Sequence, residues 1–167
     1  DERWYSWYNF DDINHECYMD NECTVGGKNG PNNNAMYVNN QDNTFNEKAK
    51  EYCIECDGIN MQSTFFDYDK DGDLDVYILN NSNIPVSSLG YAEQRNKRAQ
   101  DWENVPDIFR GVGDLLMRND GDTFTDVSEE AGIYGSLIGF GLGVMVTDIN
   151  HDLYPDIYVS NDFYERD

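Results

Sequence analysis

The sequence contains the stretch Asp67-Tyr-Asp-Lys-Asp-Gly-Asp-Leu-Asp75, which is followed by the apolar run Val-Tyr-Ile-Leu-Asn80. The same arrangement recurs later in the chain, where Asp148-Ile-Asn-His-Asp-Leu-Tyr-Pro-Asp156 is followed by Ile-Tyr-Val-Ser-Asn161. A third, looser copy, Asp12-Ile-Asn-His-Glu-Cys-Tyr-Met-Asp20, lies near the start. Acidic stretches that recur in the same context indicate an internal repeat, which constrains the fold more than any local pattern.

A second set of matching segments supports this repeat. Asn39–Phe45 resembles Arg118–Phe124, and Lys50–Ile54 resembles Glu129–Ile133, with the same offset in both cases. The spacings between the three acidic stretches are unequal, so we expect an insertion near 82–112 in the second unit. Part of this insertion reads as a short polar helix.

Short apolar segments flank the acidic stretches and are predicted to be β-strands, because they are rich in β-branched and aromatic residues and are bounded by Asn, Gly and Asp. The predicted strands include 36–38, 61–66, 74–79, 115–117, 143–147 and 157–159. Many short strands at a regular period predict an all-β fold built from β-propeller blades. We expect one propeller segment of about two and a half units, at 1–60, 61–140 and an incomplete 141–167.

The oxygen atoms of the first acidic stretch recur at the spacing of a metal-binding loop. Asp67, Asp69, Asp71 and Asp75 stand at positions 1, 3, 5 and 9, and the backbone carbonyl of Asp73 adds a further oxygen. Calcium prefers about 6–8 oxygen ligands at roughly 2.3–2.6 Å, and an all-oxygen set favours it over zinc or copper. Carboxylates packed this closely repel one another, so we expect folding of the loop to depend on metal.

An EF-hand does not fit these stretches. It needs a bidentate glutamate at position 12 and a helix afterwards. Position 12 is Cys23, Ile78 or Val159 in the three copies, and the following segments are strand-like. The remaining alternative is a solvated acidic turn without metal.

The other two copies depart from the first at position 6, where Gly72 is replaced by Leu153 or Cys17. If that position requires a positive φ, a leucine there costs about 1–2 kcal/mol, unless the turn itself differs. The copy at 12–20 is either a metal site or a degenerate remnant. We therefore expect two or three calcium ions. The further candidate ligands are Asp148, Asn150, Asp152, Tyr154 and Asp156, and Asp12, Asn14, Glu16, Tyr18 and Asp20.

These residues resemble the FG-GAP/VCBS repeat family, whose blades carry an Asp-x-Asp-x-Asp-Gly-x-x-Asp calcium loop, as in integrin α-subunit propellers. The closer resemblance is to secreted bacterial VCBS-repeat proteins related to cartilage acidic protein, which often end in an ASPIC/UnbV domain. It rests on Phe65–Asp75, Arg118–Val127 and Tyr158–Phe163, and covers most of 31–167 and, more loosely, 7–30. The replacements at position 6 and the paired cysteines depart from the family pattern.

The resemblance implies a seven-bladed propeller, located extracellularly as a secreted or cell-surface protein, that serves in binding or adhesion. A propeller needs about 4–8 blades to close, and this chain holds fewer units. We expect either a fragment of a longer polypeptide or copies that associate through open blade edges, for example as a filament.

The net charge of the chain argues against two classes of binding partner. The chain has 11 Lys and Arg against 33 Asp and Glu, for a formal net charge of −22. Such a balance argues against nucleic acid and against an anionic membrane face, because phosphate binding needs clustered cations. No run of residues is apolar and long enough to span a membrane. We expect the partners to be calcium together with a protein ligand, a glycan ligand or further copies of the chain.

Four cysteines at short spacings predict disulfides in an oxidising compartment. They are Cys17, Cys23, Cys53 and Cys56, and the local pairs Cys17–Cys23 and Cys53–Cys56 are one of three connectivities. Zinc ligation by the same cysteines is the alternative. A redox role for Cys53 and Cys56 lacks the βαβ context that such a motif requires.

Catalytic motifs are absent from the sequence. His15 and His151 stand at the same position of two aligned stretches, which common ancestry explains better than catalysis. The chain has no nucleophile elbow, P-loop or zinc-protease motif. We therefore expect no enzymatic activity; the alternative is a polysaccharide-active enzyme that uses a carboxylate pair on the propeller scaffold.

Overall fold

The computed structural model describes residues 5–9, 34–54, 59–81, 113–121, 123–133 and 140–161. Within these ranges the chain forms β-strands joined by turns, and no helix. The strands are β1 (Tyr5–Asn9), β2 (Asn34–Asn39), β3 (Phe45–Glu47), β4 (Ile59–Phe66), β5 (Asp75–Asn81), β6 (Leu115–Asn119), β7 (Phe124–Asp126), β8 (Gly141–Thr147) and β9 (Asp156–Asn161). The all-β prediction is therefore confirmed for the part of the chain that the structure describes.

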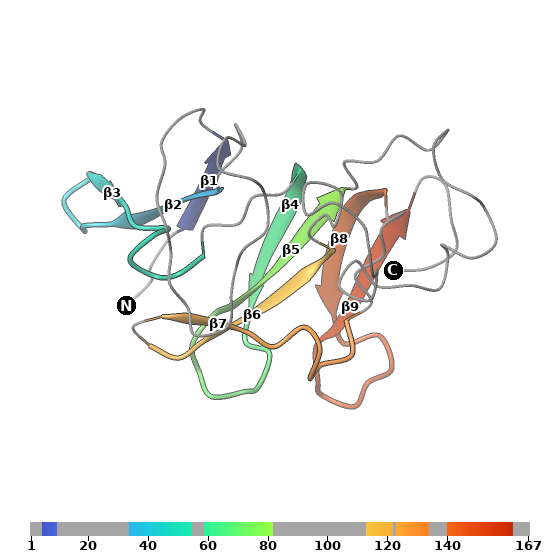
Figure 1. Ribbon diagram of the computed structural model, residues 1–167. Coiled ribbons are helices and arrows are strands. Elements are labelled where there is room, and N and C mark those ends of the chain that lie inside the picture. Colours follow the sequence, from blue (N-terminus) through green and yellow to red (C-terminus); the bar gives the residue numbers. More distant parts are fainter. Residues whose placement is uncertain are drawn as a thin grey trace, which may run out of the picture.

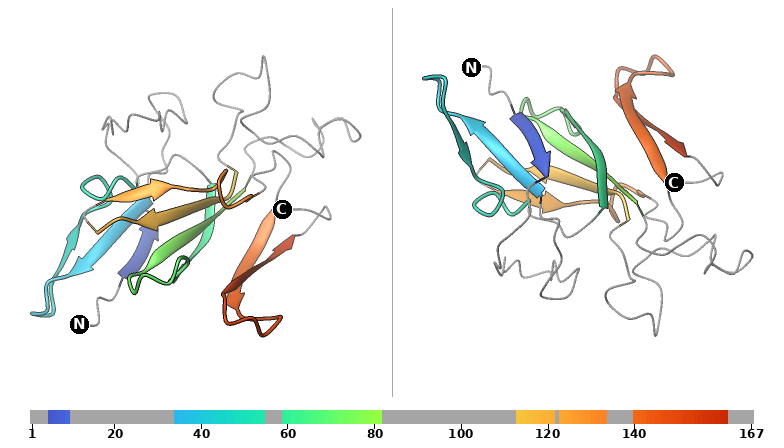
Figure 2. Two further views of the ribbon diagram at one scale, coloured as in Figure 1. Left: turned by 90° about the horizontal axis from the view of Figure 1, so that it is seen from below. Right: turned by 90° about the horizontal axis from the view of Figure 1, so that it is seen from above.

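The strands form three antiparallel sheets in the order β1-β2-β3, β4-β5-β6-β7 and β8-β9. Figure 1 shows the four-stranded sheet between the other two, and both views of Figure 2 agree with this arrangement. Each of the six strands predicted from the sequence coincides with one of these strands, to within one or two residues at its ends. The predicted insertion near 82–112, with its short helix, lies outside the described residues.

Strand β5 is the centre of the core because both of its faces are covered. Its residues 75–80 are all buried, and alternate side chains point to opposite sides, as the two-residue period of a strand requires. One face packs in a cluster made of Met36, Ala49, Ile54, Val76, Ile78, Leu115, Met117 and Phe124. The other packs in a cluster made of Phe66, Tyr77, Leu79, Leu116, Val127 and Val144. The central sheet is therefore packed on one side against residues of the first sheet and its turn, and on the other against β8.

The turns that follow β3 and β7 have the same local structure. In each, backbone N–H groups bond to carbonyls four or five residues earlier. The bonds are Tyr52 to Lys48 at 3.0 Å and Ile54 to Ala49 at 2.9 Å, and Ala131 to Val127 and Ile133 to Ser128, both at 2.8 Å. Cys53 and Gly132 occupy equivalent positions, with φ of 55° and 75°. The sequence match between these segments thus reflects a shared turn.

Two contacts fix β8 against the central sheet. The side-chain amide of Gln62 donates from Nε2 to the carbonyl of Val144 and accepts the N–H of Val144 at Oε1, both at 3.1 Å. The amide therefore pairs with β8 as a backbone segment would. Nearby, a Cβ added to Gly141 would lie 2.3 Å from Cδ1 of Leu79, so the backbone of β8 approaches this buried leucine closely.

Candidate metal centre

Two acidic loops connect the strands that lead into and out of them. Loop A (residues 67–75) joins β4 to β5, and loop B (residues 148–156) joins β8 to β9. Both have positive φ at positions 4 and 6. The angles are 65° for Lys70 and 97° for Gly72 in loop A, and 64° for His151 and 73° for Leu153 in loop B. The two loops therefore follow the same backbone path, and position 6 requires a left-handed residue in both.

Four hydrogen bonds recur at the same positions of the two loops. The N–H groups at positions 2, 5, 6 and 7 donate to the side chains at positions 9, 3, 1 and 5. In loop A these are Tyr68 to Asp75 at 2.5 Å, Asp71 to Asp69 at 3.2 Å, Gly72 to Asp67 at 3.2 Å and Asp73 to Asp71 at 3.0 Å. In loop B they are Ile149 to Asp156 at 2.7 Å, Asp152 to Asn150 at 2.9 Å, Leu153 to Asp148 at 2.9 Å and Tyr154 to Asp152 at 2.8 Å. Leu153 thus adopts the conformation of Gly72 and does not change the turn.

Loop A gathers carboxylate oxygens as the sequence predicts. Asp67, Asp69 and Asp71 each place one oxygen within 4.8 Å of the other two. Oδ1 of Asp67 and Oδ1 of Asp73 are buried and have no hydrogen-bond partner. Buried oxygens without a donor are costly unless a cation or a water satisfies them. This arrangement fits an oxygen-ligated dication.

Electrostatics in loop A favour a positive charge. The pKa of Asp73 is raised to about 6, chiefly by loss of solvent and then by the charges of Asp71 and Asp75 and a hydrogen bond with Asp71, with a smaller effect of Asp69. Burial also raises the pKa of Asp75, although the N–H groups of Asn119 and Tyr68 partly oppose it. Without a cation, it is therefore unfavourable for all of these carboxylates to be ionised at the same time.

Asp75 anchors loop A to the next hairpin. It is fully buried, and its two oxygens accept N–H groups from Tyr68 in the loop and from Asn119 at the end of β6, the latter at 2.8 Å. Asn119 also donates from Nδ2 to the carbonyl of Leu74 at 3.2 Å. Each oxygen of Asp75 keeps a second lone pair, so anchoring is compatible with metal ligation.

Asn119 is the residue of this site that sequence reasoning missed. It belongs to a segment that the sequence analysis used for the repeat match with residues 39–45 and for the family resemblance, without assigning it a place at the metal loop. A feature that could have identified it is an asparagine at the end of a strand in both segments, Asn39 in β2 and Asn119 in β6. Oδ1 of each accepts the N–H of the residue two positions later, from Gln41 at 2.8 Å and from Gly121 at 3.0 Å. A recurring Asx turn of this kind marks a constrained hairpin.

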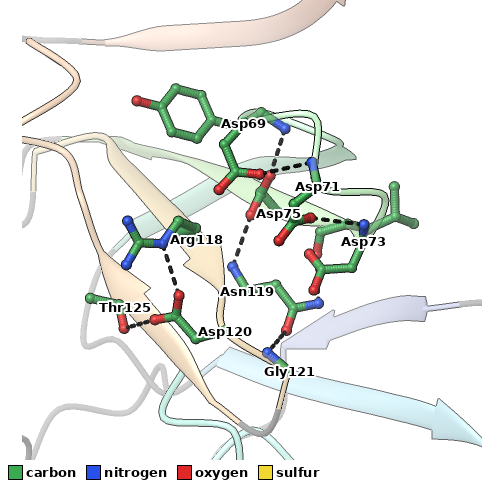
Figure 3. A network of polar contacts seen from close by, with 11 residues as sticks. Asp69, Asp71, Asp73, Asp75, Arg118, Asn119, Asp120, Gly121 and Thr125 are labelled. Carbon is green, nitrogen blue, oxygen red and sulfur yellow. Dashed lines mark hydrogen bonds and ion pairs between the residues drawn. The ribbon is translucent and has the colours of Figure 1, made fainter.

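An exposed ion pair lies beside loop A. Nε of Arg118 contacts Oδ1 of Asp120 at 2.8 Å, and the hydroxyl of Thr125 donates to the other oxygen of Asp120 (Figure 3). Both contacts lower the pKa of Asp120, and the hydrogen bond from Arg118 has the larger effect. The hydrogen bond to Asp120 is the main cause that raises the pKa of Arg118, and the negative charges of Asp120, Glu130 and Asp69 add to it. A surface pair contributes little stability, but it places a fixed cation beside the acidic loop.

Loop B contains fewer charges than loop A and is more exposed. Both oxygens of Asp148 accept backbone N–H groups, from Asp152 at 3.1 Å and from Leu153 at 2.9 Å. Nδ2 of Asn150 donates to Asp152 at 3.0 Å. Three aspartates and one asparagine replace the five aspartates of loop A. The candidate ligands of loop B are thus brought together by hydrogen bonds within the loop. Because loop B has fewer negative charges than loop A, it should attract a cation less strongly.

The third acidic stretch, with its candidate ligands Asp12, Asn14, Glu16, Tyr18 and Asp20, lies outside the described residues, as do Cys17, Cys23 and Cys56. Among the residues that are described, Cys53 has a free, half-buried thiol. The third metal site and the disulfides therefore stay predictions.

Neighbouring antiparallel sheets, two of which carry an acidic loop between their first two strands, are consistent with the blades of a propeller-like repeat. A family model described as FG-GAP-like repeat matches residues 6–78, from β1 through loop A into β5. This segment is therefore similar to an FG-GAP-like repeat, which supports the family predicted from the acidic motif. Comparison with curated protein sequences gave no match.

Repeats of this family typically occur in extracellular, β-propeller-like modules. Within the described residues the three sheets lie side by side and do not close into a ring (Figure 2). In the same part of the chain, no helix has the length and apolar character needed to cross a membrane.

Proposed function

We propose that the chain is a calcium-binding, non-enzymatic propeller segment that works outside the cell in adhesion, ligand binding or assembly. The observation that carries the proposal is the pair of buried oxygens on Asp67 and Asp73 that have no hydrogen-bond donor, next to the clustered carboxylates of Asp69 and Asp71. A dication offers these oxygens the positive partner that loop A does not provide.

Each loop would supply its own set of calcium ligands. In loop A, the side chains of Asp67, Asp69 and Asp71 would ligate the ion, with the anchored carboxylate of Asp75 and with Asp73, which offers its backbone carbonyl and its unpaired Oδ1. In loop B, the corresponding ligands are the side chains of Asp148, Asn150, Asp152 and Asp156 and the backbone carbonyl of Tyr154, which does not depend on the tyrosine side chain. A bound calcium ion would supply charge neutralisation and would fix the path of each turn between its two strands.

Asp114, a second buried acid in the described part of the chain, has a structural role, which supports the non-enzymatic proposal. Asp114 is almost fully buried and accepts the hydroxyl of Tyr77 at 2.6 Å and the N–H of Asn80 at 2.7 Å. These bonds tie the residue before β6 to strand β5. A carboxylate fully occupied in joining two strands is poorly suited to proton transfer.

One observation favours assembly through copies of the chain, as in a filament. Met145 and Tyr158 are direct partners across β8 and β9, and their exposed fractions are 54% and 56%. An exposed apolar pair on an outer sheet face is a common feature of protein–protein contacts. Sedimentation at increasing protein concentration tests this candidate, because a size that does not change with concentration would count against it.

The test of calcium binding is thermal unfolding of the full chain in calcium and in chelator, with the bound metal counted by elemental analysis. We expect two or three calcium ions per chain. At a free concentration 100 times the dissociation constant, each site should add about 2.7 kcal/mol to the free energy of unfolding.

The matched control for this experiment is the double variant Asp69→Asn and Asp71→Asn, which keeps the shape of loop A and removes two charges. It should bind one ion fewer than the wild type and lose the corresponding shift. Bound calcium of zero, with identical melting in calcium and chelator, would refute calcium binding.

A further inference from the structure

A lysine of loop A lies over an aromatic ring of loop B. Nζ of Lys70 is 3.3 Å from the centroid of the Tyr154 ring. The two loops belong to neighbouring sheets, and Figure 1 shows them projecting from the same end of those sheets. This cation–π contact therefore joins two candidate metal loops that are far apart in the sequence.

Both partners are placed by the closed form of their own loop. Lys70 stands at position 4 of loop A, where its backbone has a φ of 65°. Tyr154 stands at position 7 of loop B, where its N–H donates to Oδ1 of Asp152 at 2.8 Å. If either turn opened, one partner would leave its position. The contact consequently reports that both loops are closed at once.

The charge of Lys70 also acts across the gap between the loops. The N–H of Tyr154 and the side chain of Asn150 are the main causes that lower the pKa of Asp152, and the ammonium group of Lys70 adds to them. Lys70 is thus close enough to loop B to stabilise one of its carboxylates as well as the Tyr154 ring.

We propose that Lys70 and Tyr154 are a coupling pair that makes metal binding at the two loops cooperative. This inference rests on the proposed calcium function. A cation that orders loop A fixes the backbone of Lys70, which then holds Tyr154 and favours the closed form of loop B. Loop B therefore loses less conformational entropy when it binds its own cation. Because coupling is reciprocal, an ion in loop B strengthens binding in loop A by the same factor.

The expected size of the coupling follows from the contact that transmits it. An exposed cation–π pair corresponds to a factor of roughly two to five in an equilibrium constant. Direct repulsion between two bound dications acts in the opposite direction, but water and salt screen it. Measurements at about 0.15 M salt therefore favour detection of the coupling.

Calcium titration calorimetry on the full chain tests the proposal through the affinity of loop B, measured with loop A intact and with loop A disabled by Asp69→Asn and Asp71→Asn. These two substitutions remove two negative charges, which equals the charge that one calcium ion adds. The long-range field of a disabled loop A thus matches that of a loaded one. We expect loop B to bind calcium roughly two- to fivefold more tightly when loop A is intact and loaded.

The ratio of these two affinities should fall to one in Lys70→Gln and in Tyr154→Leu, while Tyr154→Phe, which keeps the ring, should retain it. The ratio is informative because the general effect of losing the Lys70 charge cancels from it. Lys48→Gln is the matched control: Lys48 lies over the ring of Tyr52 at 5.9 Å, in a turn that belongs to neither loop. It should leave the ratio unchanged.

A second measurement reads the loops directly. Amide resonances of residues 148–154 and 156 should shift when calcium fills loop A of the wild type, and should not shift in Lys70→Gln. Two bound ions with equal ratios in the wild type and Lys70→Gln would overturn the coupling and leave the calcium function intact. A wild-type chain that binds no calcium would overturn both.

Discussion

Loop A and loop B follow the same path but are held in place differently. Asp75, at the end of loop A, is fully buried and is held from two directions, by Tyr68 of its own loop and by Asn119 of the next hairpin. Asp156, at the end of loop B, is half-buried and accepts the N–H groups of Ile149 and Asn150, both from its own loop.

The comparison shows that the closed turn does not depend on the most favourable residues. The local hydrogen bonds of the aspartate and asparagine side chains reproduce the turn in loop B, even with Leu153 at a φ of 73° and an exposed fraction of 79%. What loop A adds is burial and an external anchor. The same motif can therefore be a part of the core in one repeat and a surface turn in another.

The largest difference between the loops should appear when the final aspartate is removed. In the metal-free chain, we expect Asp75→Ala to lower the free energy of unfolding by about 2–4 kcal/mol, because two part-buried N–H groups lose the fully buried carboxylate that accepts them. Asp156→Ala should cost under about 1 kcal/mol, since water can replace its contacts. Urea unfolding in chelator measures both, and equal losses would contradict the anchoring role of Asp75.

A smaller effect should follow from exchanging the residues at position 6. Gly72→Ala should destabilise the chain by about 1–2 kcal/mol through backbone strain alone, because a Cβ at this position meets open space. Leu153→Gly should stabilise it by up to about 1 kcal/mol, since the strain relieved exceeds the entropy that glycine loses on folding. Urea midpoints of the two variants measure these changes, and changes of the same sign would show that the two turns are not equivalent.

The smallest expected effect is on the pH dependence of stability, to which the two loops should contribute with opposite sign. The pKa of Asp73 is raised from 3.8 to about 6, so the folded, metal-free chain holds this proton more tightly than the unfolded chain. Stability should therefore fall as the pH rises from about 4 to about 6, and level off above that. Asp73→Asn should remove this part of the slope.

Loop B should behave in the opposite way. The pKa of Asp152 is lowered by hydrogen bonds to its charged form, so its contribution to stability is present above its unfolded pKa and is lost in acid. Asp152→Asn should accordingly reduce the loss of stability below about pH 4. Urea midpoints measured in chelator across pH 3–7 would separate the two residues; identical slopes in both variants would contradict these assignments.

Local patterns in the sequence were sufficient to predict the strands around each loop, because runs of β-branched and aromatic residues bounded by Asn, Gly and Asp act over a few positions. The odd-numbered aspartates likewise predicted the cluster of Asp67, Asp69 and Asp71. The sequence left open whether position 6 needs a positive φ, since Leu153 allowed either a strained turn or a different one. The φ of Leu153 answers that question in favour of strain.

The contacts that distinguish the loops could not be predicted in this way. The bond from Asn119 to Asp75 spans 44 residues, and the amide of Gln62 reaches a partner 82 residues away. Such contacts depend on how sheets stack rather than on any periodic signal. Lys70 gave no sign of its contact with Tyr154 either, because a lysine in an acidic loop reads as a solvated side chain.

Gly141 links the packing of two sheets to the evolution of the sequence. Every other amino acid at position 141 would bring a Cβ to within 2.3 Å of Leu79, which is itself fully buried and has little room to move. The two positions should therefore change together across related proteins. A large side chain at position 79 requires glycine at 141, whereas a lineage that shortens residue 79 becomes free to replace the glycine. The spacing between neighbouring blades would then be inherited as a pair of residues, and neither could change alone without separating the sheets.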